Sequence, residues 1–472
     1  MTAPDPRGSF LGTPATAPGP AGRAMLRAFG SIRRDPLAYL ASAWRSYGDI
    51  VQFPIPRPPS YLVSDPDAVR RVLAGNARAY GKSTIQYRAL SLVTGEGLLV
   101  ADTEPWRRQR RLVQPAFHHE TLEAIAGHTA VALRRMFDGW DALPPGAVTD
   151  IDEAMMHAAL EVVGHALFGT DLSADAQRLA SASLSALEVV VARARVPLTP
   201  PAWLPTPNNR KLARAVRSLD RAVARMLAER RDRRDEAPAD MLDLLLASRD
   251  ESGLGLTRQE VRDQVVTFIV AGHETVASAL SWSWALLAGH PDAQARLQAE
   301  ADEVLGGRLP GFADYEHLPY ARAALDEALR LFPPAWLVTR SAREADVLAG
   351  SAIPAGALII MSPWIVHRQP AAWADPEEFR PERFLAASVD RSGFIPFGAG
   401  PRMCIGRDFA YVEGALMLAA IAGRYELEYP RGCGLPRAEP QVTIRPVGGL
   451  PLRVRRRQPP KPWPGVIPGA RE

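Results

Sequence analysis

Cysteine and lysine are both scarce in this sequence. Its 472 residues include two cysteines, Cys404 and Cys433, and only three lysines among 56 basic residues. Two cysteines exclude a disulfide-stabilised scaffold and favour a reducing cytoplasm. The N-terminal region also lacks a signal-peptide core and an apolar run of about 18 residues, so we predict neither a signal peptide nor a membrane-spanning segment.

The composition is otherwise ordinary for a globular protein, with 47% hydrophobic residues, 23% charged residues and a formal net charge of +4. Such a balance supports a large buried core and gives no indication of nucleic-acid binding. No linker, repeat or low-complexity block interrupts the interior. We therefore expect a single domain at 25–457, between a flexible segment at 1–24 and a Pro-rich tail at 458–472.

Helical spacing dominates the interior, because apolar residues recur every three or four positions. We expect amphipathic helices at 65–74, 120–143, 210–235 and 291–305. Short apolar, β-branched runs predict strands at 50–53, 61–63, 357–360 and 452–454. Asp65 followed by Pro66 is a typical helix start. The expected fold is a mainly α domain with small β-sheets to one side.

The segment 257–289 predicts one unusually long helix. Thr257 and Glu260 fit a capping box, and Gly289 with the following His-Pro is a plausible stop. At 1.5 Å per residue the helix would be roughly 50 Å long, enough to cross a whole domain. It is apolar on several sides, as a buried central helix should be.

The segment from Phe397 to Gly406 reads F-G-A-G-P-R-M-C-I-G and is followed by a predicted helix at 405–424. Glycines at 398, 400 and 406 allow tight turns, so the loop can present the Cys404 thiolate to a metal. The start of the following helix favours the ionised sulfur. An inert buried cysteine is the alternative.

The pattern F-x-x-G-x-R-x-C-x-G resembles the heme-binding loop of the cytochrome P-450 superfamily of heme-thiolate monooxygenases. The resemblance implies the cytochrome P-450 fold and heme b, iron protoporphyrin IX, with Cys404 as the axial ligand of the iron. It places Phe397, Gly398, Arg402 and Gly406 beside the heme.

A second motif, Ala271-Gly272-His273-Glu274-Thr275, lies midway along the long helix. Glycine inside a helix costs about 1 kcal/mol relative to alanine, and a threonine hydroxyl can bond a carbonyl one turn back. The resemblance implies that Ala271 and Gly272 form an oxygen-binding groove and that Glu274 and Thr275 pass protons. A zinc-protease motif is excluded, because position 277 is alanine rather than a second histidine.

Charged residues elsewhere match further family positions. Glu327 and Arg330 share a helix face, and the resemblance implies that they form a buried structural ion network with Arg383. The two heme propionates also need cations, since a buried carboxylate must be paired. The resemblance assigns them to Trp106, Arg110, Arg340 and Arg402.

Two surfaces are less determined. Arg107, Arg108 and Arg111 form either a solvated face or a basic docking surface for an acidic electron donor. Segment 197–207 resembles a mobile lid over the pocket. The expected substrate pocket consists of Arg88, Leu92, Phe268, Trp336, Leu337, Val338 and Val442. Arg88 is either a partner for a substrate carboxylate or a surface arginine.

The resemblance implies a monooxygenase that hydroxylates or epoxidises a fatty acid, a terpenoid or a polyketide-type natural product with O2. Because no flavin domain follows residue 457, electrons from NAD(P)H are expected through a ferredoxin or flavodoxin and its reductase. Two alternatives stay open: a peroxide-driven heme enzyme, and a non-catalytic heme-thiolate binding or sensing protein. We expect a cytoplasmic monomer without a transmembrane anchor.

Overall fold

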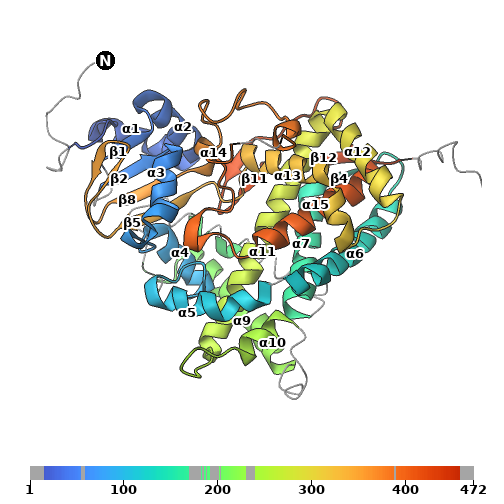
Figure 1. The fold of residues 1–472 in the computed structure, drawn as a ribbon, viewed down its shortest axis with the longest axis horizontal. Coiled ribbons are helices and arrows are strands. Elements are labelled where there is room, and N and C mark those ends of the chain that lie inside the picture. The colour runs from blue at the N-terminus through green and yellow to red at the C-terminus, as the bar shows by residue number, and fades with distance from the viewer. Residues whose placement is uncertain are drawn as a thin grey trace, which may run out of the picture.

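The computed structural model describes residues 15–54, 59–117, 119–169, 203–229, 240–386 and 390–457, with short pieces between 182 and 201. Helices dominate these residues. The largest sheet lies at the left of Figure 1, whereas other strands lie near its centre and at its right, so the sheets are not all to one side as expected. The helices are α1 (Gly22–Arg34), α2 (Pro36–Tyr47), α3 (Pro66–Arg70), α4 (Ile85–Thr94), α5 (Thr103–Val113), α6 (His119–Asp141), α7 (Ile151–Phe168), α9 (Pro207–Glu229), α10 (Met241–Ala247), α11 (Arg258–Gly289), α12 (Pro291–Leu305), α13 (Pro319–Leu331), α14 (Pro363–Val366) and α15 (Arg407–Arg424).

The strands are short and form four small sheets. A five-stranded sheet has the order β1-β2-β8-β5-β3, in which β2 and β8 are parallel and the other neighbours antiparallel. The strands are β1 (Ile50–Phe53), β2 (Ser60–Val63), β3 (Tyr80–Gly81), β4 (Val148–Asp150), β5 (Val338–Ala342), β6 (Asp346–Leu348), β7 (Ser351–Ile353), β8 (Leu358–Met361), β9 (Tyr425–Glu428), β10 (Ala438–Pro440), β11 (Ile444–Pro446) and β12 (Pro451–Arg456). The predicted mainly α fold with small sheets is confirmed.

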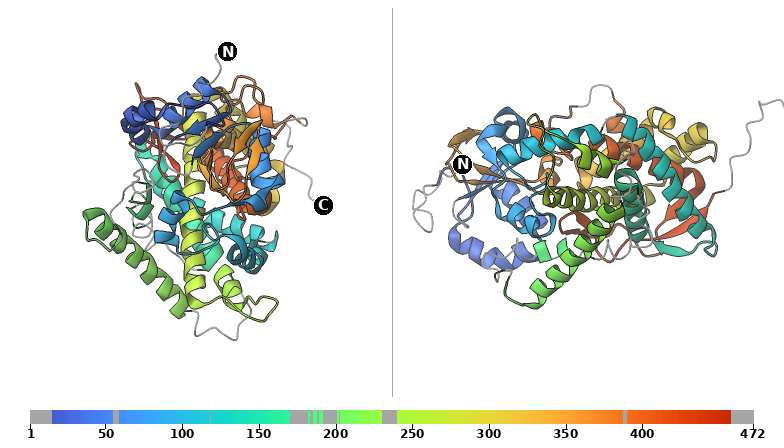
Figure 2. Two further views of the ribbon diagram at one scale, coloured as in Figure 1. Left: turned by 90° about the vertical axis from the view of Figure 1, so that its left-hand side faces the viewer. Right: turned by 90° about the horizontal axis from the view of Figure 1, so that it is seen from below.

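Helix α11 runs through the middle of the molecule, as both views of Figure 2 show. Its predicted capping box is present: Glu260 N–H donates to Thr257 Oγ1 at 3.2 Å, and Thr257 N–H donates to Glu260 Oε2 at 2.7 Å. By length and mean hydropathy α11 is the one described helix that could cross a membrane, but 83% of its most apolar stretch is buried inside the protein. This is the behaviour of a core helix.

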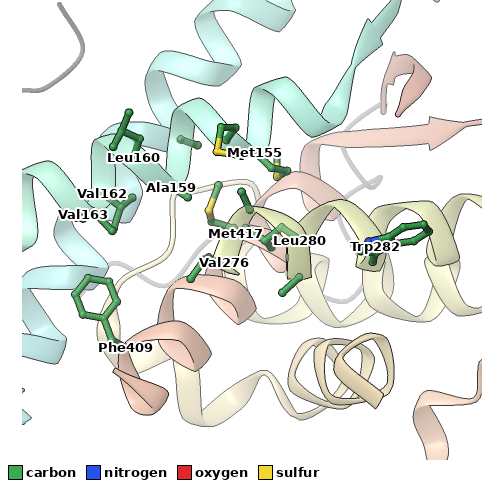
Figure 3. Close-up of a cluster of buried hydrophobic side chains, with 14 of the residues drawn as sticks. Met155, Ala159, Leu160, Val162, Val163, Val276, Leu280, Trp282, Phe409 and Met417 are labelled. Atoms are coloured by element: carbon green, nitrogen blue, oxygen red, sulfur yellow. The ribbon is translucent and has the colours of Figure 1, made fainter. Parts of the chain in front are cut away.

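The core lies where α7, α11 and α15 pack together. Figure 3 shows Met155 and Val163 of α7 facing Val276 of α11, with Phe409 and Met417 of α15 completing the cluster. These side chains are at most 7% exposed. The three helices thereby fix the middle of α11 relative to the loop that precedes α15.

Two predicted boundaries differ from the structure. The expected helix at 65–74 ends as α3 at Arg70 and continues as a π-helical turn at Arg71–Gly75. The flexible segment expected to end at residue 24 meets α1, which begins at Gly22; before it, Pro18 O accepts from Gln52 N of β1 at 2.8 Å. Residues 1–14, 230–235 and the tail at 458–472 lie outside the described part of the chain, as do residues 197–200 and 202 of the segment 197–207.

Candidate active site

The cysteine loop is shaped by two glycines and one backbone hydrogen bond. Gly398 and Gly400 have φ of +70° and +67°, a region that residues with a Cβ rarely adopt. A Cβ at position 400 would also lie 2.2 Å from Leu73 O. Cys404 N–H donates to Phe397 O at 3.0 Å and closes the loop. Gly406 differs from its predicted role as a tight-turn residue, because its φ of −91° is open to any residue.

The Cys404 side chain is exposed, yet enough protein surrounds it on the remaining sides to raise the pKa of its thiol. Burial is the largest cause; the N–H of Gly406 and the charges of Arg110 and Arg407 oppose it. Helix α15 begins at Arg407, just after Cys404, and the expected effect of its N-terminus on the sulfur stays a prediction. The sulfur is therefore accessible on one side, where it can bind a metal as a thiolate.

Positive charge gathers beside this loop, around one carboxylate. Asp102 Oδ1 pairs with Arg402 at 2.5 Å, and Asp102 Oδ2 pairs with Arg343 at 2.9 Å. Arg402 also lies over the Trp106 ring, 4.3 Å from its centroid. Buried Arg340 donates to Tyr87 Oη at 3.2 Å. Of the predicted propionate residues, the structure thus brings Arg402 and Trp106 into contact.

Lys82 belongs to the same cluster, although it was not among the residues predicted from the sequence to hold the propionates. It is 7% exposed, and its ammonium donates to Leu99 O at 2.5 Å. Burial, with the charges of Arg340 and Arg402, lowers the pKa of Lys82 well below its usual value. One signal was available: Lys82 is one of three lysines in a chain that otherwise uses arginine.

The cluster therefore holds more buried cations than its one carboxylate can balance. Buried charges of one sign need counter-charges, so the site fits a ligand that brings carboxylates. Arg110, whose Nη1 donates to Met403 O at 3.1 Å, joins this cluster to the cysteine loop. Two propionates next to a metal that accepts the Cys404 sulfur satisfy both requirements. The residues present fit heme.

The motif on α11 has the expected local geometry. Thr275 Oγ1 donates to Ala271 O at 2.6 Å, and α11 stays helical through this point. Ala271, Gly272 and Thr275 are half-buried, whereas their neighbours on the helix are buried. A Cβ at position 272 would lie 3.0 Å from a Val163 methyl group, so close packing with α7 gives a physical reason for this glycine.

Glu274 faces a different direction from Thr275. It is 1% exposed, and its Oε1 accepts from Thr443 Oγ1 at 2.9 Å. Burial raises the pKa of Glu274 to about 7, against the opposing effects of Arg445 and Thr443. The carboxyl therefore exchanges its proton near neutral pH. Neighbouring His273 is fully buried, and burial lowers its pKa to about 4, so it is neutral.

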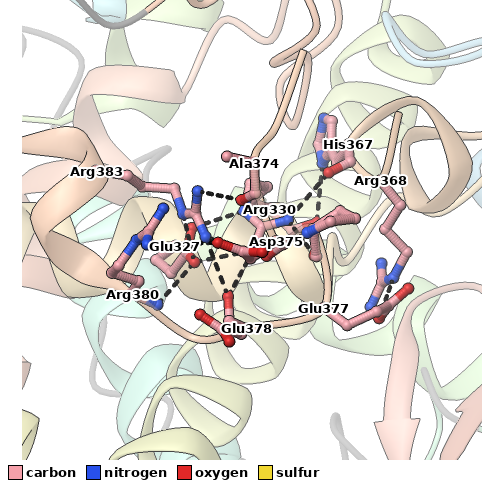
Figure 4. Close-up of polar contacts among 11 residues, drawn as sticks. Glu327, Arg330, His367, Arg368, Ala374, Asp375, Glu377, Glu378, Arg380 and Arg383 are labelled. Atoms are coloured by element: carbon pink, nitrogen blue, oxygen red, sulfur yellow. Dashed lines mark hydrogen bonds and ion pairs between the residues drawn. The ribbon is translucent and has the colours of Figure 1, made fainter. Parts of the chain in front are cut away.

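The ion pairs expected among Glu327, Arg330 and Arg383 are present (Figure 4). Glu327 accepts from Arg330 Nε at 2.7 Å and from Arg383 Nε at 2.9 Å, and the side chains of Glu327 and Arg330 are fully buried. Arg330 also donates to three carbonyls, at His367, Pro376 and Glu378. The network ties α13 to the 374–383 loop.

The three arginines of the possible docking surface form ion pairs within the chain. Arg108 pairs with Asp250 at 2.7 Å and Glu260 at 2.9 Å, and Arg111 pairs with Glu251, so the expected basic face is largely neutralised locally. Arg107 pairs with Glu104. These pairs weaken the docking hypothesis, because charges already matched within the chain attract a partner less.

The predicted pocket residues do not share one environment. Arg88 is exposed on α4, which matches the surface-arginine alternative rather than a carboxylate partner. Trp336 is buried, and its indole N–H donates to Gln441 O at 2.8 Å, so it holds the β10–β11 hairpin. Phe268 is buried against the Phe117 ring. The half-buried members are Leu92, Leu337, Val338 and Val442.

A loop that presents one sulfur, a cation cluster beside it and a central helix with a threonine groove define a heme-thiolate protein. The comparisons agree. The cytochrome P-450 family model matches residues 18–451. The chain belongs to the cytochrome P-450 family.

Relatives and a solved structure cover nearly the whole chain. Cyclooctatin synthase of Streptomyces melanosporofaciens is 38% identical over 91% of this chain and 93% of its own length. Pentalenene oxygenase of Streptomyces avermitilis is 35% identical over 88% of this chain and 90% of its own. The crystal structure of CYP175A1 from Thermus thermophilus matches with a TM-score of 0.74 and 33% identity, over 93% of this chain and 100% of that one. The protein is a cytochrome P-450 monooxygenase with heme held by a cysteine thiolate.

Proposed function

We propose that this monooxygenase oxidises a terpenoid. The observation that carries the proposal is the set of relatives at 35–39% identity over most of the chain, which are cyclooctatin synthase, cyclooctat-9-en-7-ol 5-monooxygenase and pentalenene oxygenase. Half-buried apolar residues such as Leu337 and Val442 suit an apolar substrate. Hydroxylation or epoxidation of a terpenoid skeleton is the proposed reaction, with electrons from a ferredoxin or flavodoxin and its reductase.

A binding panel tests the substrate class. Cyclic terpenes, fatty acids and polyketides should be titrated into the purified holoprotein while the Soret band reports the spin state of the iron. Terpenes are expected to shift the band at the lowest concentrations. A shift with fatty acids and none with any terpene would overturn the assignment.

Heme supplies the oxygen activation and oxygen insertion of this family when it is bound. In our proposal Cys404 would bind the heme iron through its sulfur, and Lys82, Arg340, Arg402 and Trp106 would hold the propionates. Thr275 holds and donates a proton at its Oγ1 on the groove side of α11, and Glu274 restores protons from the interior. A proton passed by a positioned side chain contributes about 10²–10⁴-fold to rate.

Replacing Thr275 with valine is expected to uncouple the enzyme. The variant keeps the side-chain shape but loses the hydroxyl that now bonds Ala271 O. Product per NAD(P)H consumed should fall about tenfold or more, and hydrogen peroxide should rise correspondingly. Thr267→Val, a buried threonine two turns earlier on α11, is the matched control and should stay coupled.

Unchanged coupling in Thr275→Val would contradict the proton role of Thr275. The same assay distinguishes the peroxide-driven alternative, which forms product from hydrogen peroxide without a reductase. A non-catalytic binding protein would form product under neither condition.

A further inference from the structure

The β10–β11 hairpin is fixed to the part of α11 that carries the threonine motif. Ser278 Oγ and Trp282 Nε1 both donate to Ile444 O, at 2.7 and 3.0 Å. One residue earlier in the hairpin, Thr443 donates to Glu274. The hairpin therefore places its next side chain, Arg445, in the interior near Glu274.

Arg445 pairs with one buried carboxylate, and its charge also acts on a second buried carboxylate, Glu274, from a different helix. Its Nη2 pairs with Asp152 Oδ2 of α7 at 2.6 Å, with side chains 12% and 10% exposed. The other Asp152 oxygen accepts from Ser281 Oγ of α11 at 2.8 Å. Oε2 of Glu274 is buried and has no hydrogen-bond partner among the described residues. Arg445 is thus directly paired with Asp152 and acts on Glu274 through its charge alone.

The charges around Glu274 act in opposite directions. Burial has the largest effect and raises the pKa of Glu274. The positive charge of Arg445 lowers this pKa, and the negative charge of Asp152 raises it. On α11 itself the adjacent His273 is neutral. On α15 Glu413 is neutral too, because burial raises its pKa well above the usual value. Arg445 and Asp152 are therefore the charged groups that decide the balance.

We propose that Arg445 and Asp152 are positioning residues that set the proton affinity of Glu274 through their opposite charges. The positive charge of Arg445 favours the ionised form of Glu274. The negative charge of Asp152 weakens that effect, because it partly cancels the charge of Arg445. The consequence for turnover rests on the proposed function of Glu274. The effect on Glu274 itself does not.

Infrared spectroscopy of the resting holoprotein tests the proposal. The C=O stretch of protonated Glu274 is identified as the band lost in Glu274→Gln, and its intensity is followed against pH. Arg445→Met should move the titration midpoint up by about 1 pH unit or more, because an opposite charge is removed. Asp152→Asn should move it down, because Arg445 then acts on Glu274 alone.

Ser278→Ala is the matched control. It removes a hydrogen bond that holds the same hairpin and changes no charge, so the midpoint should stay where it is. Arg445→Lys keeps the charge, should stay near the parent midpoint, and provides a folded variant if Arg445→Met does not accumulate. Shifts of the same sign in Arg445→Met and Asp152→Asn, or no shift in either, would overturn the proposal, since a structural role predicts no opposite signs.

The pH dependence of coupled turnover separates this inference from the proposed function. It should move with the infrared midpoint in each variant. Infrared midpoints that move in opposite directions while the turnover profile stays fixed would support the charge assignment and refute the proton role of Glu274.

Discussion

Glu327→Ala is expected to yield protein that does not retain heme. The carboxylate is fully buried and is the counter-charge of both Arg330 and Arg383, so its loss leaves two guanidinium groups without that counter-charge. Breaking a buried ion pair from one side typically costs about 3–5 kcal/mol. That is a large part of the total stability of about 5–15 kcal/mol that domains have.

The network also explains why the effect reaches beyond α13. Glu327 Oε1 accepts from Arg380 N–H at 2.9 Å, and Arg383 holds Ala374 O at 2.9 Å, so the carboxylate organises the whole 374–383 loop. Purified variants should be compared by heme absorbance relative to protein absorbance and by urea unfolding.

Glu428→Ala is the control, because its pair with Arg455 lies at the surface, where pairs contribute about 0–1 kcal/mol. It should behave like the parent. Heme-replete Glu327→Ala with parent-like unfolding would show that the network is dispensable.

Glu413→Met is expected to stabilise the protein, increasingly as the pH rises. Glu413 lies on α15 between Phe409 and Met417 in helical spacing, is 0% exposed, and has no hydrogen bond to either oxygen from the described residues. Burial alone raises the pKa of Glu413 well above its usual value. A carboxyl with no partner in an apolar cluster is a cost of folding.

The sign of the pH dependence follows from proton linkage. Because the folded pKa is raised, the folded protein binds a proton that the unfolded chain releases above its ordinary pKa of about 4.5. The stability of the parent therefore falls by about 1.4 kcal/mol per pH unit from there up to the raised pKa. Methionine has no such dependence, so its advantage should grow as the pH rises from 5 towards 7, by at most about 1.4 kcal/mol per pH unit.

Urea unfolding at pH 5, 6 and 7 measures this difference. Glu413→Gln is the companion variant: it also removes the pH dependence, but it keeps a polar group without a partner and should gain less. Glu274, with its own pKa near 7, contributes equally to all three proteins and cancels. A constant difference across pH would mean that Glu413 has a partner and a lower pKa than its surroundings indicate.

The features that the sequence predicted well are local in the chain. The capping box at Thr257, the bond from Thr275 back to Ala271 and the loop around Cys404 each lie within ten residues, so their geometry follows from spacing. The Glu327 network was found only because the family resemblance joined its distant members. The prediction of heme as the cofactor also came from the family resemblance.

What the sequence did not predict depends on contacts between distant segments. Asp152 and Arg445 are 293 residues apart, and no periodicity relates them. Lys82 is buried beside Arg340 of β5 and Arg402 of the cysteine loop, both of which are distant from it in the sequence. Arg88 had two readings in the sequence, and its exposure on α4 matches the surface-arginine alternative.

The absorption spectrum of the ferrous carbon monoxide complex tests the central assignment, a bond between the Cys404 sulfur and heme iron. The parent should show the red-shifted Soret band of an anionic sulfur ligand, and Cys404→His should show the shorter-wavelength band of imidazole-ligated heme. A parent protein without the red-shifted band, or a Cys404→His variant that keeps it, would contradict the account.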